Sequence, residues 1–375
     1  MKLIKLALVC AVFGGMVGCK TTDVTPTQAH RWYDADGTVF LEPPAPGEGI
    51  QIVVDTFAVP LGKEVQGNFY FKLPITTPLN IGRIEIATNK GTHHMNCFRT
   101  QIVQTADSST KPKRMIFTQN GKTDTTSILF QPTFYSTTVW LASDMLIEAQ
   151  KDSFVWDLAK LPNDTTVPAN IRGKQTTVTL QPNENMVIET HFVNVDSAHQ
   201  VTPNGKGKVI INLYKTHETD IVSASMMVAR RTPLVLPAGQ TTTVTKICDF
   251  GGATFPIWIM GMTGHYHSRG KSFFVDVVQY ATFPDGSINT NKDLVKIVTP
   301  KIYQNNTWDE PPFTTYPVPY KIPYGQTLQY TAVYFNNTPN TIFFGPHVET
   351  EEHCNLFSWF VPGDGSGRTY YDTKQ

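Results

Sequence analysis

The stretch MVIETHFVNV, residues 186–195, gives the clearest indication of how this chain folds. In an extended chain Glu189, His191 and Val193 lie on one face, and Ile188, Thr190 and Phe192 lie on the other. A short run rich in apolar and β-branched residues is typical of a β-strand. The stretch therefore predicts a strand that carries a carboxylate and an imidazole on the same face.

Short apolar or alternating runs of the same kind recur along the chain, separated by Pro, Gly and Asn, and long amphipathic helical stretches are absent. Many short strands between turn residues are typical of β-sandwich or jelly-roll architecture. We therefore expect an all-β protein. The other predicted strands cover residues 50–57, 68–73, 83–88, 127–130, 137–141, 176–180, 208–214, 241–247, 272–279, 328–335 and 356–361.

The length of 375 residues suits one large domain or two ordinary ones. One predicted strand ends at Tyr214, and a new apolar run opens at Ile221. We place a boundary near residue 217, which predicts an N-terminal domain over residues 46–217 and a C-terminal domain over residues 218–375.

The charge balance excludes some partners. The chain has 31 Lys and Arg against 31 Asp and Glu, so its formal net charge is zero. No basic field exists to attract nucleic acid, and no acidic field to attract polycations. Gly-x-Ser-x-Gly and P-loop motifs are also absent, which argues against a serine hydrolase or a nucleotide-binding protein.

The N-terminus has the pattern of an export signal. Lys2 and Lys5 precede an apolar run over residues 6–17, which is too short to span a membrane. The run ends in Met-Val-Gly-Cys at residues 16–19, which resembles the lipobox of bacterial lipoproteins. That resemblance implies a signal peptide over residues 1–18, acylation of Cys19, a tether over residues 19–45 and a lipid anchor on the periplasmic face or the cell surface of a bacterium. The alternative is an ordinary secretory signal with an incidental cysteine.

Three cysteines remain beyond the signal and the expected lipid site: Cys97, Cys248 and Cys354. Because three is odd, at most one disulfide forms among them, and the pairing stays open. No Cys-x-x-Cys spacing indicates a zinc ribbon or a thioredoxin-like site.

The ten histidines are the most informative residues. His93 and His94 are adjacent, so both imidazoles reach one metal ion only if the backbone kinks, as at a bulge. His265 and His267 have the i, i+2 spacing that puts both rings on one face of a strand, with Tyr266 on the other.

The remaining histidines allow more ordinary interpretations. His191 alone is typical of a structural strand histidine. His347 and His353 flank an acidic stretch that is more typical of a solvated loop. We interpret His30, His199 and His217 as surface or structural residues.

Four motifs occur in a definite order: Thr-His-His-Met at 92–95, Glu-Thr-His at 189–191, His-Tyr-His at 265–267 and Glu-Glu-His-Cys at 351–354. Together they resemble the copper type II, ascorbate-dependent monooxygenases, a family that includes peptidylglycine α-hydroxylating monooxygenase and dopamine β-monooxygenase. The resemblance runs from about residue 50 to the C-terminus.

The resemblance implies two tandem jelly-roll-like β-sandwich domains that face each other across a cleft, each with one copper ion. It assigns an electron-transfer copper to His93, His94 and His191, and an oxygen-binding copper to His265, His267 and, by position, His353. It also implies O2 and a reductant such as ascorbate as cosubstrates, and hydroxylation of a C–H bond in a small or peptide-like substrate.

This chain departs from the family pattern at the second site. His353 occupies the position of the family's methionine ligand, and imidazole is a harder ligand than a thioether, so the oxygen chemistry should change. Met262 and His347 are spare candidates for that position. A copper-binding lipoprotein of the same fold without hydroxylase activity is therefore the alternative function, and a β-sandwich scaffold with incidental histidines is a third.

The substrate handles also differ. Thr263 and, approximately, Phe357 stand where peptide-amidating members have an arginine and a tyrosine, so the partners of a peptide carboxylate are missing. Glu189, Asn355 and Phe357 are the weaker candidates for contacts with a substrate.

Overall fold

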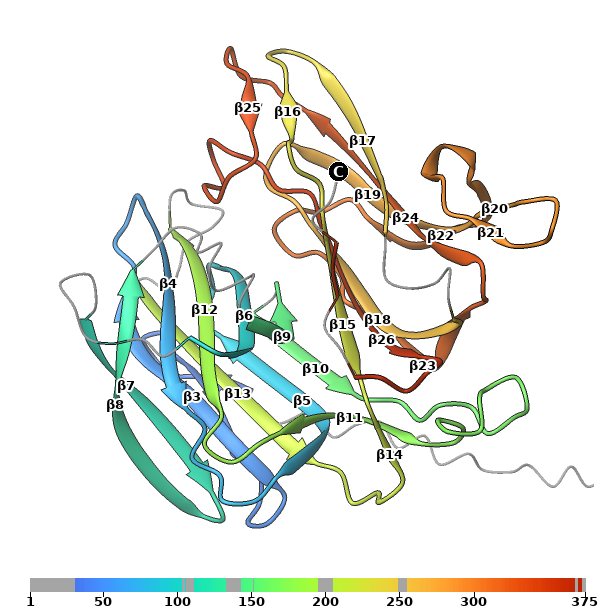
Figure 1. Cartoon of the computed structure of the whole chain (residues 1–375). Helices are drawn as coiled ribbons and strands as arrows, with labels where there is room; N and C mark the ends of the chain where they lie inside the picture. Colours follow the sequence, from blue (N-terminus) through green and yellow to red (C-terminus); the bar gives the residue numbers. More distant parts are fainter. Residues whose placement is uncertain are drawn as a thin grey trace, which may run out of the picture.

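The computed structural model describes residues 31–102, 105, 111–132, 143–150, 152–194, 205–248, 255–367 and 370–372. The predicted signal peptide, Cys19, His30, His199 and the predicted strand at 137–141 lie outside these residues. Strands dominate the described chain, and the one helical element is a 3-10 turn, η1 (Lys292–Leu294), so the prediction of an all-β protein is confirmed (Figure 1). Among the described residues, no helix has the length and apolarity needed to cross a membrane.

The N-terminal half forms one large, curled mixed sheet of twelve strands (Figure 1). Neighbouring strands are antiparallel except β11 and β14, which are parallel. The order is β14 (Ile221–Ser223), β11 (Gln175–Leu180), β5 (Leu79–Thr88), β13 (Lys206–Lys215), β3 (Gly49–Ala58), β7 (Lys111–Gln119), β8 (Lys122–Pro132), β4 (Lys63–Lys72), β12 (Asn185–Asn194), β6 (Thr92–Thr100) and β9 (Ser143–Ala149), while β10 (Ser153–Asp157) pairs with β5.

The C-terminal half contains two sheets that pack face to face. One has five strands in the order β23 (Thr314–Ile322), β18 (Ile257–His265), β26 (Asn355–Pro362), β15 (Ser225–Arg230) and β27 (Tyr370–Asp372). The other has four, in the order β17 (Thr241–Ile247), β24 (Gln326–Phe335), β19 (Gly270–Gln279) and β22 (Lys296–Asn305). Two small ladders complete this half: β16 (Val235–Leu236) with β25 (Ile342–Phe343), and β20 (Ala281–Thr282) with β21 (Ile288–Asn289).

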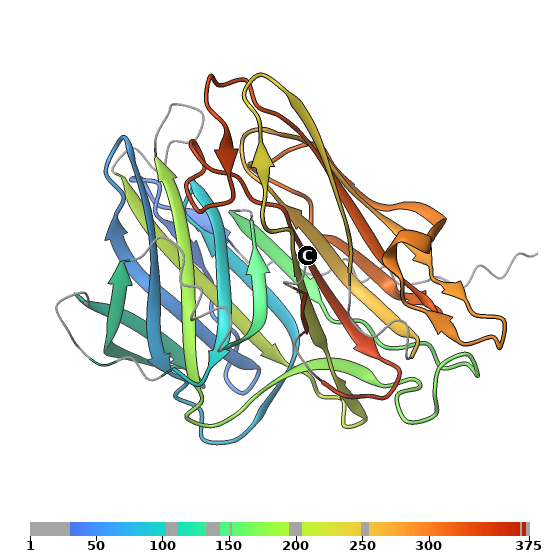
Figure 2. The ribbon, with the colours of Figure 1, turned by 45° about the horizontal axis from the view of Figure 1, so that its top comes forward.

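The five-stranded sheet lies between the large sheet and the four-stranded sheet (Figure 2). Strands β15, β18 and β26 are buried along their whole lengths. Alternate side chains of β18 and β26 enter different cores: Trp258 and Trp359 belong to the core of the N-terminal half, while Ile259 and Phe360 belong to the core of the C-terminal half. The two halves are therefore joined by a continuous apolar interface.

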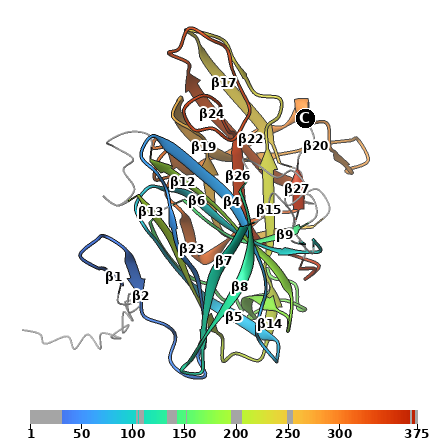
Figure 3. The same cartoon turned by 90° about the vertical axis from the view of Figure 1, so that its left-hand side faces the viewer.

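A short hairpin precedes the large sheet and lies on its outer side (Figure 3). Its strands are β1 (Arg31–Tyr33) and β2 (Val39–Leu41), and Val39 and Leu41 are buried in a small cluster with Val53, Ala87 and Ile210. The range predicted as a tether, residues 19–45, thus includes a hairpin that packs on the core.

Candidate metal centre

Six histidines from separate parts of the chain lie together and are all buried. The ring centroid of His93 is 5.3 Å from that of His94, 5.2 Å from that of His191 and 4.8 Å from that of His265. On the C-terminal side, the rings of His267 and His353 are 4.4 Å apart. We call His93, His94, His191, His265, His267 and His353 the histidine cluster; they are the six residues that the sequence predicted as metal ligands.

The N-terminal histidines come from two paired strands of the large sheet. His94 on β6 is the cross-strand neighbour of His191 on β12. The register then shifts, because Phe192 pairs with Thr92 and His93 is left as the extra residue. This irregularity is the kink that the sequence required, and it turns the ring of His93 toward those of His94 and His191.

The C-terminal histidines flank a turn. His265 ends β18, and His267 follows two residues later, with their ring centroids 5.4 Å apart. Between them, Tyr266 points into the C-terminal core and stacks on Phe273 at 6.1 Å. A Cβ atom on Gly270 would lie 1.8 Å from the ring of Tyr266, so only glycine leaves room for this packing.

His353 is held just before β26. The Tyr334 hydroxyl donates to its carbonyl oxygen at 2.7 Å, and its Nδ1 lies 3.0 Å from Nε2 of His265. The neighbouring Glu352 is fully buried and accepts hydrogen bonds from the backbone N–H groups of His267, Arg269 and His353. Glu352, at the end of the acidic stretch, is therefore buried and links the segments that carry His267 and His353. It does not lie in a solvated loop.

The donor atoms form two overlapping groups that could each hold a metal ion, with all atoms of a group within 4.8 Å of one another: His93, His94 and His265, and His265, His267 and His353. His191 is in neither group, since its Nε2 lies 3.0 Å from a carboxylate oxygen of Glu64. Glu64 also accepts from the backbone N–H of Val348 at 3.4 Å, so it links the two halves.

The grouping differs from the one that the resemblance implies. The resemblance separates the two histidine sets by a cleft, whereas here rings from both halves are in contact and share His265. The physical reason is the apolar interface, because Trp359 and Trp258 dock the five-stranded sheet directly on the N-terminal core.

Hydrogen bonds fix two rings in orientations that suit metal binding. The side-chain N–H groups of Gln150 donate to Thr263 and to the carbonyl of Gly264, which leaves its oxygen to accept from Nδ1 of His265 at 2.7 Å. Nδ1 of His267 donates to the carbonyl oxygen of Glu351 at 3.1 Å. In both rings Nε2 then carries the lone pair, which is the arrangement found in metal-binding histidines.

The Nε2 atoms of His93, His267 and His353 are buried and have no hydrogen-bond partner. A buried polar atom without a partner is costly, and a neutral imidazole nitrogen is a preferred ligand of copper and zinc. The residues present therefore fit a transition-metal ion.

Burial also keeps these rings neutral. Desolvation lowers the pKa of His267 to about 3 and lowers the pKa values of His93, His94, His265 and His353 well below the usual range, with neighbouring imidazoles contributing. Because only neutral imidazole binds a metal, the cluster is ready for a cation at neutral pH.

Other predicted residues take different places. Glu189 is buried, and its carboxylate accepts from the side chains of Gln66 and Asn96 at 2.9 and 3.0 Å. Met262 packs in the C-terminal core. His347 is 43% exposed and lies 4.0 Å from Glu64, and His217 lies at the surface beside Glu48. Cys97, Cys248 and Cys354 are all buried, and no disulfide joins them to one another.

A small cavity of about 10 Å³ adjoins the histidine cluster. Asn355 and Phe357, predicted from the sequence as substrate contacts, line it. The other lining residues are His94, Asn96, Glu148, His265 and His353. Sequence reasoning missed Glu148, Gln150 and Glu64, and no motif marks them; only their positions on strands that neighbour histidines would have identified them.

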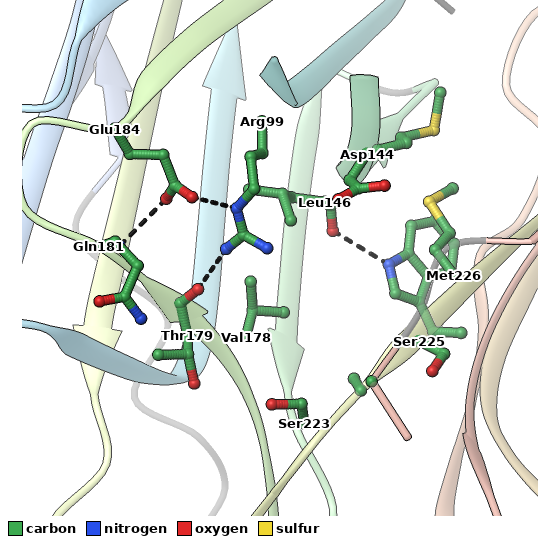
Figure 4. A pocket seen from close by; sticks show the side chains of 14 residues that line it. Arg99, Asp144, Leu146, Val178, Thr179, Gln181, Glu184, Ser223, Ser225 and Met226 are labelled. Atoms are coloured by element: carbon green, nitrogen blue, oxygen red, sulfur yellow. Dashed lines mark hydrogen bonds and ion pairs between the residues drawn. The ribbon is translucent and has the colours of Figure 1, made fainter. Parts of the chain in front are cut away.

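A larger cavity of about 370 Å³ lies at the junction of the two halves (Figure 4). Arg99 ion-pairs with Glu184 at its edge and donates to the carbonyl of Thr179, while Met226 and Trp359 also line it. None of the clustered histidines lines this cavity, so it is separate from the candidate metal centre.

Comparison with known proteins does not assign a family. No family model matches the chain, and no curated protein matches it. Among solved structures, infectious bursal virus-derived T=1 particles match with 10% identity over 88% of this chain and 73% of that chain, at a TM-score of 0.19. A PNGF-II structure matches with 11% identity over 84% of this chain and 61% of that chain, at a TM-score of 0.21. These scores are too low to carry any argument about function.

Proposed function

We propose that this chain is a copper-dependent monooxygenase that hydroxylates a C–H bond of a small or peptide-like substrate, using O2 and a reductant such as ascorbate. The observation that carries the proposal is the convergence of four sequence motifs, up to 260 residues apart (93 to 353), in one buried cluster of neutral imidazoles. Two jelly-roll-like domains over residues 46–217 and 218–375, with a cleft that admits substrate, stay predictions within this proposal.

The ligand set supports copper. Imidazole nitrogens suit copper, zinc, nickel and iron, and among divalent ions of this series copper binds most tightly to a given site. When bound, copper supplies the one-electron chemistry with O2 that side chains lack. The protein's own residues would hold the ion and shield it from bulk solvent, and hydrogen bonds to Nδ1 fix the tautomers of His265 and His267.

Two copper ions can bind at once only if the contact between His191 and Glu64 changes. The two groups share His265, whose Nδ1 is engaged by Gln150, so a single atom, Nε2, serves both. If His191 exchanges Glu64 for a metal ion, it completes a set with His93 and His94 and leaves His265 to the other set. We therefore propose a capacity of two copper ions, in the ligand sets that the resemblance implies.

The test is to load the full chain with copper, count the bound metal and follow ascorbate-driven O2 uptake with a panel of amines and peptides. We expect about two copper ions per chain and substrate-dependent uptake. Less than one copper ion per chain at neutral pH would rule out both this function and the next one.

A copper-binding protein without hydroxylase activity is the second candidate. It is favoured by His353, which supplies an imidazole where a thioether would favour Cu(I), and by the direct contact of rings from the two halves. If the wild type binds copper without substrate-dependent uptake and His353→Met restores uptake, the second candidate holds.

The predicted lipid anchor completes the proposal. Acylation of Cys19 would anchor the protein to a bacterial membrane, on the periplasmic face or at the cell surface, with the hairpin at residue 31 as the first packed element of the described chain. Metabolic labelling with palmitate tests this, and Cys19→Ser should abolish the label.

A further inference from the structure

The small cavity beside the histidine cluster is surrounded by polar atoms that lack partners. Oδ1 of Asn96 and Oδ1 of Asn355 are buried and make no hydrogen bond, and the buried carboxyl group of Glu148 has only the side chain of Gln150 near enough to interact with it. The side chains of Glu148, Asn96 and Asn355 are 1%, 2% and 3% exposed, respectively. Burying several polar atoms around one cavity costs free energy unless an occupant of the cavity forms hydrogen bonds with them.

Strand pairing brings these side chains together. Glu148 on β9 is the cross-strand neighbour of Asn96 on β6, and Asn355 on β26 is the cross-strand neighbour of His265 on β18. The cavity is thus formed from both halves of the chain. His265 and His353 line it as well, so whatever occupies it meets the edge of the candidate metal centre.

The volume limits the occupant. A cavity of about 10 Å³ holds about one water molecule, which needs two to four polar partners. A water molecule has two hydrogens to donate and two lone pairs that accept. It can donate to the two amide oxygens and still bond to the Glu148 carboxyl group, whose pKa is raised well above its usual range by burial.

We propose that Glu148, Asn96 and Asn355 hold one water molecule, or a neutral hydrogen-bond donor of the same size, against His265 and His353. Glu148 is a positioning residue in this arrangement. The proposal deepens the proposed function, because the occupant lies where a small ligand would reach a metal ion on those histidines, but its first test does not depend on copper.

The first test uses the metal-free full chain and two matched variants. Glu148→Gln keeps the shape and the hydrogen-bonding groups, while Glu148→Met keeps the length and removes them. We expect Glu148→Met to lower the midpoint of thermal unfolding by at least about 2 °C relative to Glu148→Gln. If the carboxyl group had no partner in the cavity, Glu148→Met would remove the free-energy cost of burying it. An unfolding midpoint of Glu148→Met at or above that of the wild type would therefore overturn the proposal.

The second test uses the chain loaded with Cu(II) and exchanged into D2O. Pulsed electron paramagnetic resonance should detect, beyond the deuterons on the imidazole rings, an additional exchangeable deuteron near copper in the wild type and in Glu148→Gln, and this additional signal should be absent in Glu148→Met at equal copper content. The absence of the additional signal in copper-loaded wild type, or an unchanged additional signal in Glu148→Met, would refute the inference. A chain that takes up no copper refutes the proposed function instead, and the first test still decides the inference. Asn355→Leu replaces Glu148→Met, with the same criteria, if that variant does not fold.

Discussion

At the scale of single residues, Gln150 has the most specific role outside the histidine cluster. Its oxygen accepts from Nδ1 of His265 at 2.7 Å, and its amino group is anchored on Thr263 and Gly264. Groups that orient a metal-binding histidine typically contribute a factor of about 10–100 to metal affinity.

We predict that Gln150→Ala lowers the copper affinity of the full chain by about 10–100-fold, because His265 loses the partner that fixes its tautomer. Competition with a chelator of known affinity measures this. Gln150→Glu is the matched control, since its carboxylate still accepts from Nδ1, and its affinity should stay closer to that of the wild type. Equal affinities for Gln150→Ala and the wild type would contradict the assigned role.

The lowered histidine pKa values give a pH dependence with a definite sign. Burial lowers the pKa of His267 from 6.5 to about 3, so between these values the unfolded chain binds a proton that the folded chain does not. The free energy of unfolding of the metal-free protein therefore falls as the pH drops below 6.5, by up to about 1.4 kcal/mol per pH unit for one such histidine. Glu352 acts in the opposite sense, since burial raises its pKa to about 8 and its contribution is lost as the pH rises from 4.5 through that value.

Comparison with His267→Gln isolates the histidine contribution from that of Glu352. Between pH 6.5 and pH 4, we predict that the unfolding free energy of this variant changes less steeply than that of the wild type, by up to about 1.4 kcal/mol per pH unit. Urea denaturation at a series of pH values measures both slopes. Parallel slopes would show that His267 is not held neutral.

The six metal-ligand candidates could be named from the sequence, because motif order and spacing mark them. Glu64, Glu148 and Gln150 could not, because alternation along one strand shows which face a side chain is on but not which strand lies beside it. His191 shows the same limit: its strand face was predicted, while its partner Glu64 lies 127 residues away.

At the scale of elements, some strands were predicted well, while a uniformly apolar strand and a charged strand were not. β12 and β13 lie where the sequence placed them. β18 reads IWIMGMTGH and has no polar face, because both of its faces are buried, so periodicity does not reveal it. β7 was missed for a different reason. Three of its first four residues are charged (KPKR), so it lacks the apolar run by which a strand is recognised.

The turn between β18 and β19 depends on Gly270. We predict that Gly270→Ala destabilises the protein by about 1–3 kcal/mol, because a Cβ atom there meets the ring of Tyr266, which is held against Phe273. Urea denaturation measures the loss. Gly239→Ala in a positive-φ turn with open space around it is a useful comparison, since its cost comes from backbone strain alone. If the turn is loosely packed, Gly270→Ala will be tolerated.

At the scale of the whole molecule, the five-stranded sheet joins the two halves, because its side chains pack in the cores of both. Trp359 is 1% exposed, its indole N–H donates to the carbonyl of Leu146 at 3.1 Å, and its ring packs on Trp156 at 5.5 Å. A boundary near residue 217 describes the chain order, but the core of the N-terminal half includes side chains from β15, β18 and β26.

We predict that Trp359→Ala lowers the free energy of unfolding by about 3–5 kcal/mol while unfolding stays a single transition, because both halves depend on the interface. Trp32→Ala is the matched control: Trp32 is 48% exposed, and its loss should cost no more than about 0.5 kcal/mol. Two separate transitions, recorded by tryptophan fluorescence and circular dichroism, would show that the halves fold independently.

The thiols of Cys97 and Cys354 bear on which donor atom, nitrogen or sulfur, would bind a soft metal ion in this protein. Cys97 follows the N-terminal histidines on β6, and Cys354 is bonded in sequence to His353, yet burial raises the pKa of each thiol to about 12. Thiolate, the form that captures copper and is oxidised by it, is therefore almost absent at neutral pH. A metal ion in this interior would be bound by imidazole nitrogen and not by sulfur, and cysteines beside a redox-active ion would be protected from oxidation.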